Sequence, residues 1–414
     1  MRQRTMTEDT SKTPLALAVN AGSSSLKAAL IRKDHTHVAS FVGERLSSDD
    51  AVLHYTFEDD SSKVDVPNSD HEHVLQRILD LLKQRNYLEQ LVVSGHRVVH
   101  GGDTFTKSAV VDDKVIEEIE SVSHLAPLHN PHNIKGIEAI RKTLPSLPIV
   151  AVFDTSFHTS LPQKASTYPI PKKYRKKGIR KYGFHGTSVR YVTRKAMEIL
   201  PKMKSKENFN LIVCHLGNGA SVTAVAGGKS VETSMGFSPL AGLMMGTRTG
   251  DIDPTVISFA VNSLGLTVDE ILDDLNKESG LRAMVDSHDP DMRSILEQAD
   301  KGDEQAKLAV DMFVYRLVQH IASSLVALPG AVDAIIFTGG IGEHSPKIRK
   351  ACAECLQQTI LPGFTLDDDK NNNDGNDSNG VLTAEGAFPA GLEIATDEEA
   401  MIAQDCFELI SSQN

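Results

Sequence analysis

Tryptophan is absent from this 414-residue chain, cysteine occurs four times, and aromatic residues make up only 5% of it. Four cysteines in so long a chain do not form the dense disulfide framework of small secreted domains. Cys352 and Cys355 have C-x-x-C spacing, but they fall in an expected helix without a second ligand pair, so we expect them to pack rather than bind metal. Long apolar runs are also missing. Stretches such as residues 211–214 and 334–337 are far too short to cross a bilayer.

An excess of positive charge is likewise lacking, since the formal net charge is −12. This balance argues against nucleic acid or an anionic membrane as partner. An anionic substrate would need local arginines, lysines or backbone N–H groups. The first 14 residues mix both signs of charge and contain no apolar stretch of the kind found in secretory signals, which favours a disordered extension of a cytoplasmic protein.

Two polar turns stand out among what is present. Residues 20–27 read Asn-Ala-Gly-Ser-Ser-Ser-Leu-Lys and residues 215–221 read His-Leu-Gly-Asn-Gly-Ala-Ser, each between two apolar runs. Glycine permits close approach of the backbone to a ligand, and consecutive N–H groups in such turns bind anions. A single Gly/Ser turn is usually only a hairpin. Two of them, with residues 25–28 and 221–224 related by an offset of 196, predict paired phosphate-binding loops in two similar halves.

Strands alternate with helices along the rest of the chain, which predicts an α/β fold with a mixed sheet. Helical periodicity is clear at 72–84, 188–200, 256–263 and 303–328, and apolar strands are expected at 91–99, 148–153 and 334–337. The run 366–380 is rich in Asp and Asn and is interpreted as a solvated surface loop. A final helix is expected at 397–409.

Several charged residues lie at strand ends or beside glycines, where phosphoryl transfer needs them. Arg97 ends a strand before Gly101-Gly102, and Arg248 lies in the loop 245–254; each is a plausible oxyanion clamp, with a structural ion pair as the alternative. Asp154 closes a strand at the edge where α/β proteins bind ligands, so it is a candidate for holding Mg²⁺ or for capping a helix.

His185 is flanked by Gly183 and Gly186 just before an expected helix, in a place suited to an anion. His215 is a weaker candidate of the same kind. Gly339, Gly340, Ile341 and Gly342 follow a strand and precede a helix. Nucleotide contact there is plausible, although the full G-x-G-x-x-G spacing is missing.

Together these segments resemble the acetate kinase family, within the larger group of sugar kinase, Hsp70 and actin-like folds. The matching stretches are residues 19–27, 96–102, 125–131, 152–158, 182–188, 215–221, 245–254 and 337–343. The resemblance implies two RNase H-like (actin-like ATPase) domains with mixed sheets flanked by helices, and an active site in the cleft between them. It also implies reversible, Mg²⁺-dependent phosphoryl transfer from ATP to acetate, giving ADP and acetyl phosphate by direct in-line transfer.

The same resemblance assigns residue roles. It implies that Arg97 and Arg248 bind substrate and phosphoryl group, that His185 and Arg248 stabilise the transition state, and that Asp154 is an essential acid. Nucleotide phosphates would be held by the first loop (Asn20, Ser23, Ser25, Lys27) and the second (His215, Gly217, Asn218, Gly219), with Gly339–Gly342 at the adenosine. Asn20 and Glu398 would be associated with magnesium, with Glu399 a close competitor. Val99, Leu128, Phe184 and Pro239 would form the pocket for the methyl group.

Two departures from the family pattern, His132 and Gly339, remove no expected contact. The implied organisation is an extension at 1–14, a first domain at 15–155 plus 396–414, and a second at 156–395, paired as a homodimer. Propionate or butyrate remains an alternative acceptor, because one methylene changes specificity by only about 1–3 kcal/mol. A nucleotide switch of the Hsp70 or actin type is the alternative from another class, but it needs neither the two arginines nor an acceptor pocket.

Overall fold

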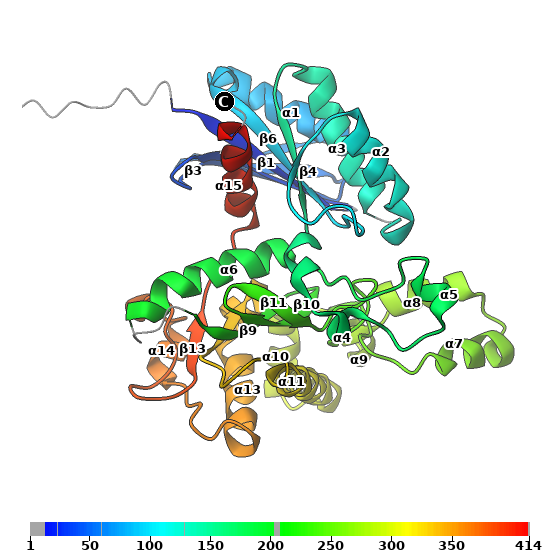
Figure 1. Cartoon of the computed structure of the whole chain (residues 1–414), viewed down its shortest axis with the longest axis vertical. Coiled ribbons are helices and arrows are strands. Elements are labelled where there is room, and N and C mark those ends of the chain that lie inside the picture. Colours follow the sequence, from blue (N-terminus) through cyan, green and yellow to red (C-terminus); the bar gives the residue numbers. More distant parts are fainter. Residues whose placement is uncertain (1–12, 23, 59, 128, 203–207, 413–414) are drawn as a thin grey trace, which may run out of the picture. The chain divides into compact units, whose positions relative to one another are not determined.

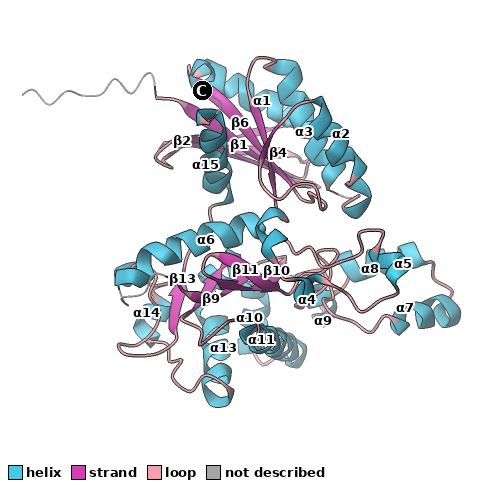
Figure 2. Cartoon of the chain, viewed as in Figure 1, coloured by secondary structure: helices cyan, strands magenta, loops and turns pink. Residues whose placement is uncertain are grey.

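The computed structural model describes residues 13–22, 24–58, 60–127, 129–202 and 208–412. They fall into two compact units, Met1–Ser156 with Asp397–Asn414, and Phe157–Thr396. Each unit contains one β-sheet with helices on both faces (Figures 1 and 2). The expected mixed α/β fold is therefore confirmed. Of the extension expected at 1–14, all but the last two residues lie outside the described residues.

The first unit has an eight-stranded sheet in the order β5-β4-β3-β2-β1-β6-β8-β7. β1, β6 and β8 run parallel to one another, and the remaining neighbours are antiparallel. The strands are β1 (Leu15–Ala21), β2 (Leu26–Arg32), β3 (His37–Glu44), β4 (Val52–Phe57), β5 (Asp60–Asp65), β6 (Leu91–Val98), β7 (Ala109–Val110) and β8 (Ile149–Phe153).

Helices cover both faces of this sheet because its strands are apolar on both sides. Leu15, Leu17 and Val19 of β1 point into the core shared with α1 (His71–Gln84), α2 (Asp113–Ser121) and α3 (Asn130–Thr143). The alternate residues Ala16 and Ala18 face α15 (Glu398–Ser411). Figure 1 shows α15 on one side of the sheet and α1–α3 on the other.

Small residues on the second face let α15 approach closely. A Cβ built on Gly95 of β6 would lie 2.4 Å from Sγ of Cys406 and 2.4 Å from Cγ2 of Ile402, both in α15. Any larger residue at 95 would push the helix off the sheet, because cores at native density have no room for an added methyl.

The second unit has a five-stranded sheet in the order β11-β10-β9-β12-β13. α6 covers one face, and α11 packs on the other together with α10 and α13 (Figure 1). The strands are β9 (Asn210–Leu216), β10 (Ala220–Ala226), β11 (Lys229–Thr233), β12 (Ala334–Thr338) and β13 (Ala390–Glu393). The helices are α4 (Gln163–Ser166), α5 (Lys172–Arg175), α6 (Gly186–Ile199), α7 (Thr255–Phe259), α8 (Val268–Lys277), α9 (Gly280–Met284), α10 (Met292–Asp300), α11 (Glu304–Leu325), α12 (Gly339–His344), α13 (Pro346–Thr359) and α14 (Asp368–Asn372).

The two sheets share one topology. β3-β2-β1-β6-β8 and β11-β10-β9-β12-β13 have the same order and the same directions, three antiparallel strands followed by two parallel ones. This supports the two similar halves inferred from the turns. The offset of 196 that relates the strands after the two turns cannot also relate the strands before them, however. Four residues separate β1 from β2, whereas three separate β9 from β10.

The helix expected at 256–263 is confirmed, as the short α7 followed by a π-helical turn, Ala260–Leu264, which ends at the left-handed Gly265. One local expectation was wrong. The run 366–380 is not a solvated loop throughout. It contains α14, whose Asn371 is buried and accepts a hydrogen bond from Nε of Arg349 at 2.8 Å. Elsewhere Cys214, Cys352 and Cys406 are buried, and all four cysteines are free. No helix in the described ranges is long and apolar enough to span a membrane.

Candidate active site

The turn between β1 and β2 is held from three directions through its carbonyl groups. The carbonyl of Ala21 accepts from Nδ2 of Asn133 at 3.0 Å, and that of Gly22 accepts from Nε2 of His71 at 2.7 Å. The carbonyl of Ser24 accepts from N of Leu46 at 3.0 Å. These bonds fix the turn before any ligand arrives, which is the preorganisation an anion site needs. Ser23, expected to contact phosphate, lies outside the described residues.

Arg97, at the end of β6, is the centre of a charged cluster in the first unit. Its Nη2 donates to Oδ2 of Asp154 at 2.6 Å, and its Nη1 donates to Oδ1 of Asn20 at 3.1 Å. Its Nε lies 3.8 Å from Oε2 of Glu398, the first residue of α15. Parallel pairing of β6 with both β1 and β8 brings Asn20, Arg97 and Asp154 to one edge of the sheet. Lys27 lies directly opposite Asn20 in the β1–β2 ladder.

Burial and charge oppose each other in this cluster. Burial alone would lower the pKa of Arg97, but Asp154 and Glu398 raise it above its usual value. Burial raises the pKa of Glu398 to about 7, with the Asp154 and Glu399 carboxylates adding to the rise and Arg97 opposing it. Two carboxylates thus share one guanidinium. The raised pKa of Glu398 shows that negative charge is not fully compensated there, so a further cation beside it would be stabilised.

The oxygen donors of this cluster fit a magnesium ion. Asp154 and Glu398 supply carboxylates and Asn20 supplies an amide oxygen, and Mg²⁺ is held in nucleotide enzymes by one or two carboxylates plus substrate phosphates. Within the described ranges, no three His, Cys, Asp or Glu side chains are arranged to hold a metal without such help. Glu398 contacts both Arg97 and Asn20, at 3.8 and 3.4 Å. No such contact is recorded for Glu399.

His185 occupies a constrained position in the second unit. It precedes α6 with φ of 58°, in the left-handed region that favours glycine. Its Nδ1 is 3.0 Å from Oγ of Ser221 in β10, and its ring centroid is 4.2 Å from that of His215 in β9. Left-handed backbone in a residue other than glycine costs energy and persists only where surrounding contacts enforce it. Here those contacts orient Nε2 toward the second turn.

A hydrogen-bond chain orients the ring of His215. Oγ1 of Thr396 donates to Oγ of Ser188 at 2.7 Å, and that hydroxyl is 2.8 Å from Nδ1 of His215. These two contacts fix the orientation of the His215 ring through its Nδ1. Sequence reasoning singled out His215 but neither Ser188 nor Thr396.

The second turn is packed against the loop that carries Arg248. A Cβ built on Gly219 would lie 3.1 Å from Nε2 of His185 and 3.5 Å from Nη1 of Arg248. N of Gly246 donates to the carbonyl of Asn218 at 3.0 Å, and a Cβ on Gly246 would collide with Oδ1 of Asn218 at 2.0 Å. An added methyl on either side of the contact would therefore force a neighbouring side chain to shift. The structure brings Asn218, Gly219, His185 and Arg248 together.

Beside this turn lies a cavity of about 550 Å³, a size typical of small-molecule sites. Gly217 and Asn218 line it from the second turn, and Gly340 and Ile341 line it from α12. Sequence reasoning missed the rest of its wall, which consists of Asp289, Pro290, Asp291, Met292, Arg293, His344 and Ser345. No motif marks the segment 289–293, which ends with the first two residues of α10, Met292 and Arg293.

The residues expected around a methyl group are divided between the two units. Val99 is buried in the first unit, and its N–H donates to Oδ1 of Asn133 at 3.1 Å. Phe184 is buried in the second unit, where its carbonyl is 2.9 Å from Nε2 of His158. The carbonyl of Pro239 accepts from Nη1 of Arg248 at 3.1 Å. Leu128 lies outside the described residues, and the methyl pocket stays a prediction.

Comparisons with known proteins give a consistent result. The model of the acetokinase family matches residues 15–404. The chain is 43% identical over 401 residues to the acetate kinase of Fervidobacterium nodosum, covering 95% of this chain and 97% of that protein. It is 45% identical over 398 residues to the acetate kinase of Staphylococcus haemolyticus, with coverage of 94% and 98%.

Solved structures agree. A crystal structure of a propionate kinase from Francisella tularensis matches with a TM-score of 0.89 and 40% identity, covering 95% of this chain and 99% of that one. A crystal structure of the Porphyromonas gingivalis acetate kinase matches with a TM-score of 0.85 and 34% identity, with coverage of 96% and 100%.

Proposed function

This chain belongs to the acetokinase family, and on that premise we propose that it transfers the γ-phosphoryl group of ATP to acetate. An oxygen of the acetate carboxylate bonds to the γ-phosphorus while the bond from that phosphorus to the β–γ bridging oxygen breaks, giving acetyl phosphate and ADP. The observation that carries the proposal is the convergence of His185 and Arg248 on Gly219, in the turn whose Gly217 and Asn218 line the cavity of about 550 Å³.

The acceptor explains why a general base is not needed. Acetate is ionised at neutral pH, so the reaction needs alignment and charge neutralisation rather than proton removal. On this proposal Arg248 and His185 bind the oxygens of the transferring phosphoryl group, where fixed donors stabilise charge without reorganisation. Arg97 binds the carboxylate, with its guanidinium held in place by Asp154 at 2.6 Å.

The nucleotide is assigned by the same reasoning. The cavity lined by Gly217, Asn218, Gly340 and Ile341 has room for an adenosine, which favours ATP over pyrophosphate as donor. Ser25 and Lys27 of the first turn and His215 of the second are assigned to the phosphates, together with Gly339 and Gly342 at the start of α12. Magnesium, when bound, would neutralise phosphate charge. Asn20 and Glu398, with Asp154 beside them, are the residues that would hold it.

The decisive experiment traps acyl phosphate as its hydroxamate with hydroxylamine. The wild type should form acetyl hydroxamate from ATP, Mg²⁺ and acetate. Arg97→Ala and Arg248→Ala should each fold normally and lose about 10²-fold or more in kcat, as expected for one charge-assisted contact to the transition state. Arg282→Ala is the matched control, because Arg282 forms an exposed i,i+4 ion pair with Glu278 and should change turnover little. Wild-type rates in both active-site variants would contradict the assignment.

The choice of acid is the second measurement. The Francisella tularensis relative carries the name propionate kinase, which makes a longer acceptor a specific alternative. Comparing kcat/KM for acetate, propionate and butyrate distinguishes them, with each added methylene worth about 1–3 kcal/mol. A chain that binds ATP but forms no hydroxamate with any of the three acids would instead be a nucleotide switch.

We also propose that the protein forms a homodimer through the second unit, in the cytoplasm. Apolar side chains gather unusually exposed on α7, α8 and the turn between them: Val256, Phe259, Leu264, Val268 and Leu272 are 41%, 62%, 63%, 51% and 38% exposed. Large apolar side chains that stay this exposed over neighbouring segments of a charged protein are typical of an interface. Light scattering during gel filtration should give twice the chain mass for the wild type and the monomer mass for a Phe259→Asp/Leu264→Asp variant. A monomeric wild type would refute the proposal.

A further inference from the structure

The segment Lys172–Lys181 is strongly basic within an acidic protein. It contains seven Lys and Arg residues and no Asp or Glu, although the chain as a whole carries a net charge of −12. Lys181 is compensated by an ion pair with Glu232 and a hydrogen bond to the carbonyl of Thr233. Across the described ranges, no ion pair is recorded for Lys172, Lys173, Arg175, Lys176 or Lys177. The segment therefore keeps an excess of positive charge.

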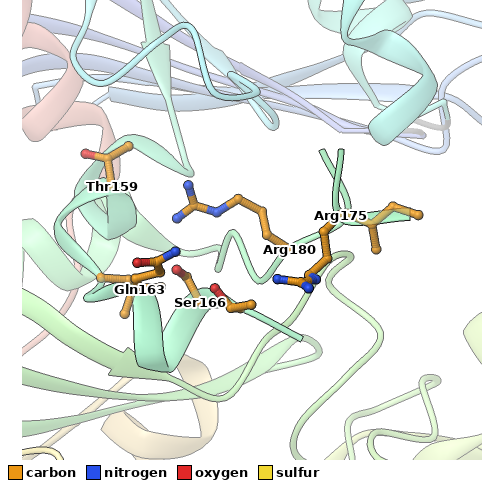
Figure 3. Close-up of a pocket in the computed structure, with 8 residues that line it drawn as sticks. Thr159, Gln163, Ser166, Arg175 and Arg180 are labelled. Atoms are coloured by element: carbon orange, nitrogen blue, oxygen red, sulfur yellow. The ribbon is translucent and has the colours of Figure 1, made fainter. Parts of the chain in front are cut away.

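This charge borders a polar cavity of about 340 Å³ in the second unit. Its polar lining consists of Arg175 and Arg180 with Thr159, Gln163, Ser166 and Thr167. In Figure 3 the side chains of Arg180, Thr159 and Gln163 lie around the same hollow, with Arg175 and Ser166 next to them. None of these residues has a part in the proposed phosphoryl transfer.

Backbone contacts hold the two arginines in place. Nε of Arg175 donates to the carbonyl of Ile170 at 3.0 Å, and Nε of Arg180 donates to the carbonyl of Lys181 at 3.3 Å. The guanidinium carbon of Arg180 lies 5.5 Å from the centroid of the Tyr182 ring. Anchoring through Nε restricts the terminal nitrogens of each guanidinium, and a restricted planar fork loses little entropy when it binds an oxyanion.

We propose that this cavity, defined by Arg175, Arg180, Gln163 and Ser166, binds a small anion with two or more carboxylate or phosphate groups. Two arginines match a ligand with at least two oxyanion groups, since each guanidinium can make bidentate bonds to one. The hydroxyl and amide groups of Ser166 and Gln163 add neutral polar partners. A volume of about 340 Å³ suits a small molecule and is too small for a polymer chain.

Calorimetric titration of the full chain tests the proposal with two probes, propane-1,2,3-tricarboxylate and inorganic pyrophosphate. At least one probe should bind saturably, with Kd on the order of 1 mM or tighter at about 0.1 M salt, and the binding should weaken as salt increases. Tighter binding of the first probe would identify carboxylate ligands, and tighter binding of the second would identify phosphate ligands.

Variants locate the binding. Arg175→Gln/Arg180→Gln should weaken the titrated Kd about tenfold or more, as loss of charge-assisted hydrogen bonds requires. The exposed double variant Lys63→Gln/Lys114→Gln removes the same charge elsewhere and should leave Kd unchanged. Arg248→Ala should leave the Kd of propane-1,2,3-tricarboxylate unchanged, and that of pyrophosphate unchanged when the nucleotide site is saturated with ADP, because the proposed phosphoryl site is separate. Arg175→Gln alone, at an exposed position, provides the test if the double variant does not fold.

Three results would overturn the proposal: no saturable binding of either probe, equal weakening in the Lys63/Lys114 control, or loss of binding in Arg248→Ala with full binding in the Arg175/Arg180 variant. The last result would place the probe at the phosphoryl site instead.

Discussion

Replacing Gly219 by alanine tests the geometry of the proposed phosphoryl site with a single methyl group. The new Cβ would lie 3.1 Å from Nε2 of His185, whereas ordinary van der Waals contact begins at 3.4 Å. His185 cannot easily yield, since Ser221 lies at 3.0 Å from its Nδ1 and the His215 ring centroid lies at 4.2 Å from its own. The methyl must therefore displace the imidazole, or the turn itself, by about 0.3 Å.

The expected cost falls on turnover rather than on folding. Misplacement of a reacting group by about 1 Å can reduce the rate about 10²-fold, so a shift of a third of that size, with a methyl beside Nη1 of Arg248, should lower kcat about tenfold. This corresponds to about 1.4 kcal/mol on the barrier. Gly219 does not have positive φ, and alanine at such a position changes stability by only about 0.4–1 kcal/mol.

The assay couples ADP release to a spectroscopic signal at saturating ATP and acetate, with thermal unfolding measured in parallel. Gly330→Ala is the control. Its Cβ would make an ordinary contact at 3.4 Å with Nδ2 of Asn210 and would meet none of the proposed site residues. Gly340→Ala gives a contrast. Its Cβ would meet no protein atom within 4 Å, so it should raise KM for ATP and leave kcat near wild type.

Wild-type kcat in Gly219→Ala would refute the reasoning, since a methyl at 3.1 Å from a functional imidazole cannot be neutral. A fall in kcat matched by loss of folded protein would also refute it, because the turn would then be a structural element only.

Other predictions follow from single contacts. Arg349→Met should lower the free energy of unfolding by about 3 kcal/mol in chemical denaturation. Buried Arg349 donates to the carbonyl of Gly342 and to both the side chain and the carbonyl of Asn371. The control Arg282→Met, which breaks only the ion pair with Glu278, should cost less than about 1 kcal/mol. Asp154→Asn should leave the fold intact and lower kcat about 10²-fold, since it removes the anion that orients Arg97; an unchanged kcat would contradict that role. Glu393→Gln should raise Tm by a few degrees at pH 8 and not at pH 5. Burial and Glu343 raise the pKa of Glu393 to about 7. Between the usual pKa of a glutamate and pH 7 the native state therefore binds a proton that the unfolded state has lost, and the free energy of unfolding falls as the pH rises through this window. Equal shifts in Tm at the two pH values would refute this explanation.

Local sequence patterns were sufficient to predict hairpins and amphipathic helices, because these depend on residues close together in the chain. Strand, Gly-rich turn and strand at residues 15–32 and 210–226 are confirmed as antiparallel hairpins. The periodicity at 72–84 corresponds to α1, whose buried Val74, Leu75 and Ile78 form one face. The order of strands was beyond such reasoning, because parallel pairing of β1 with β6 joins residues about 75 positions apart and leaves no local trace.

The site shows the same division. Arg97, Asp154, His185 and Arg248 could be proposed as site residues because they lie at strand ends or beside glycines, and their roles stay predictions. The structure pairs Arg97 with Asp154 and brings His185 and Arg248 to Gly219. Segment 289–293 was not recognisable, since a cavity wall needs only shape and proximity, and neither is encoded in a short motif. Asn371 was hidden for another reason. The composition of the Asp/Asn-rich run 366–380 predicts that most of its side chains are solvated. It cannot show that one of these asparagines is buried and hydrogen-bonded to Arg349.

The path of the chain through the two units has a consequence for how the protein is made. The second unit is an insertion, since the first is completed only by residues from Asp397 onward. During synthesis the strands β1, β6 and β8 emerge early, but the helix that covers their Ala16, Ala18 and Val150 face emerges last. The usual order of domain folding on the ribosome, amino-terminal first, is thereby reversed. In the nascent first unit, this apolar face of the sheet stays uncovered while more than two hundred further residues are synthesised. We expect chaperones to bind the chain mainly during that interval.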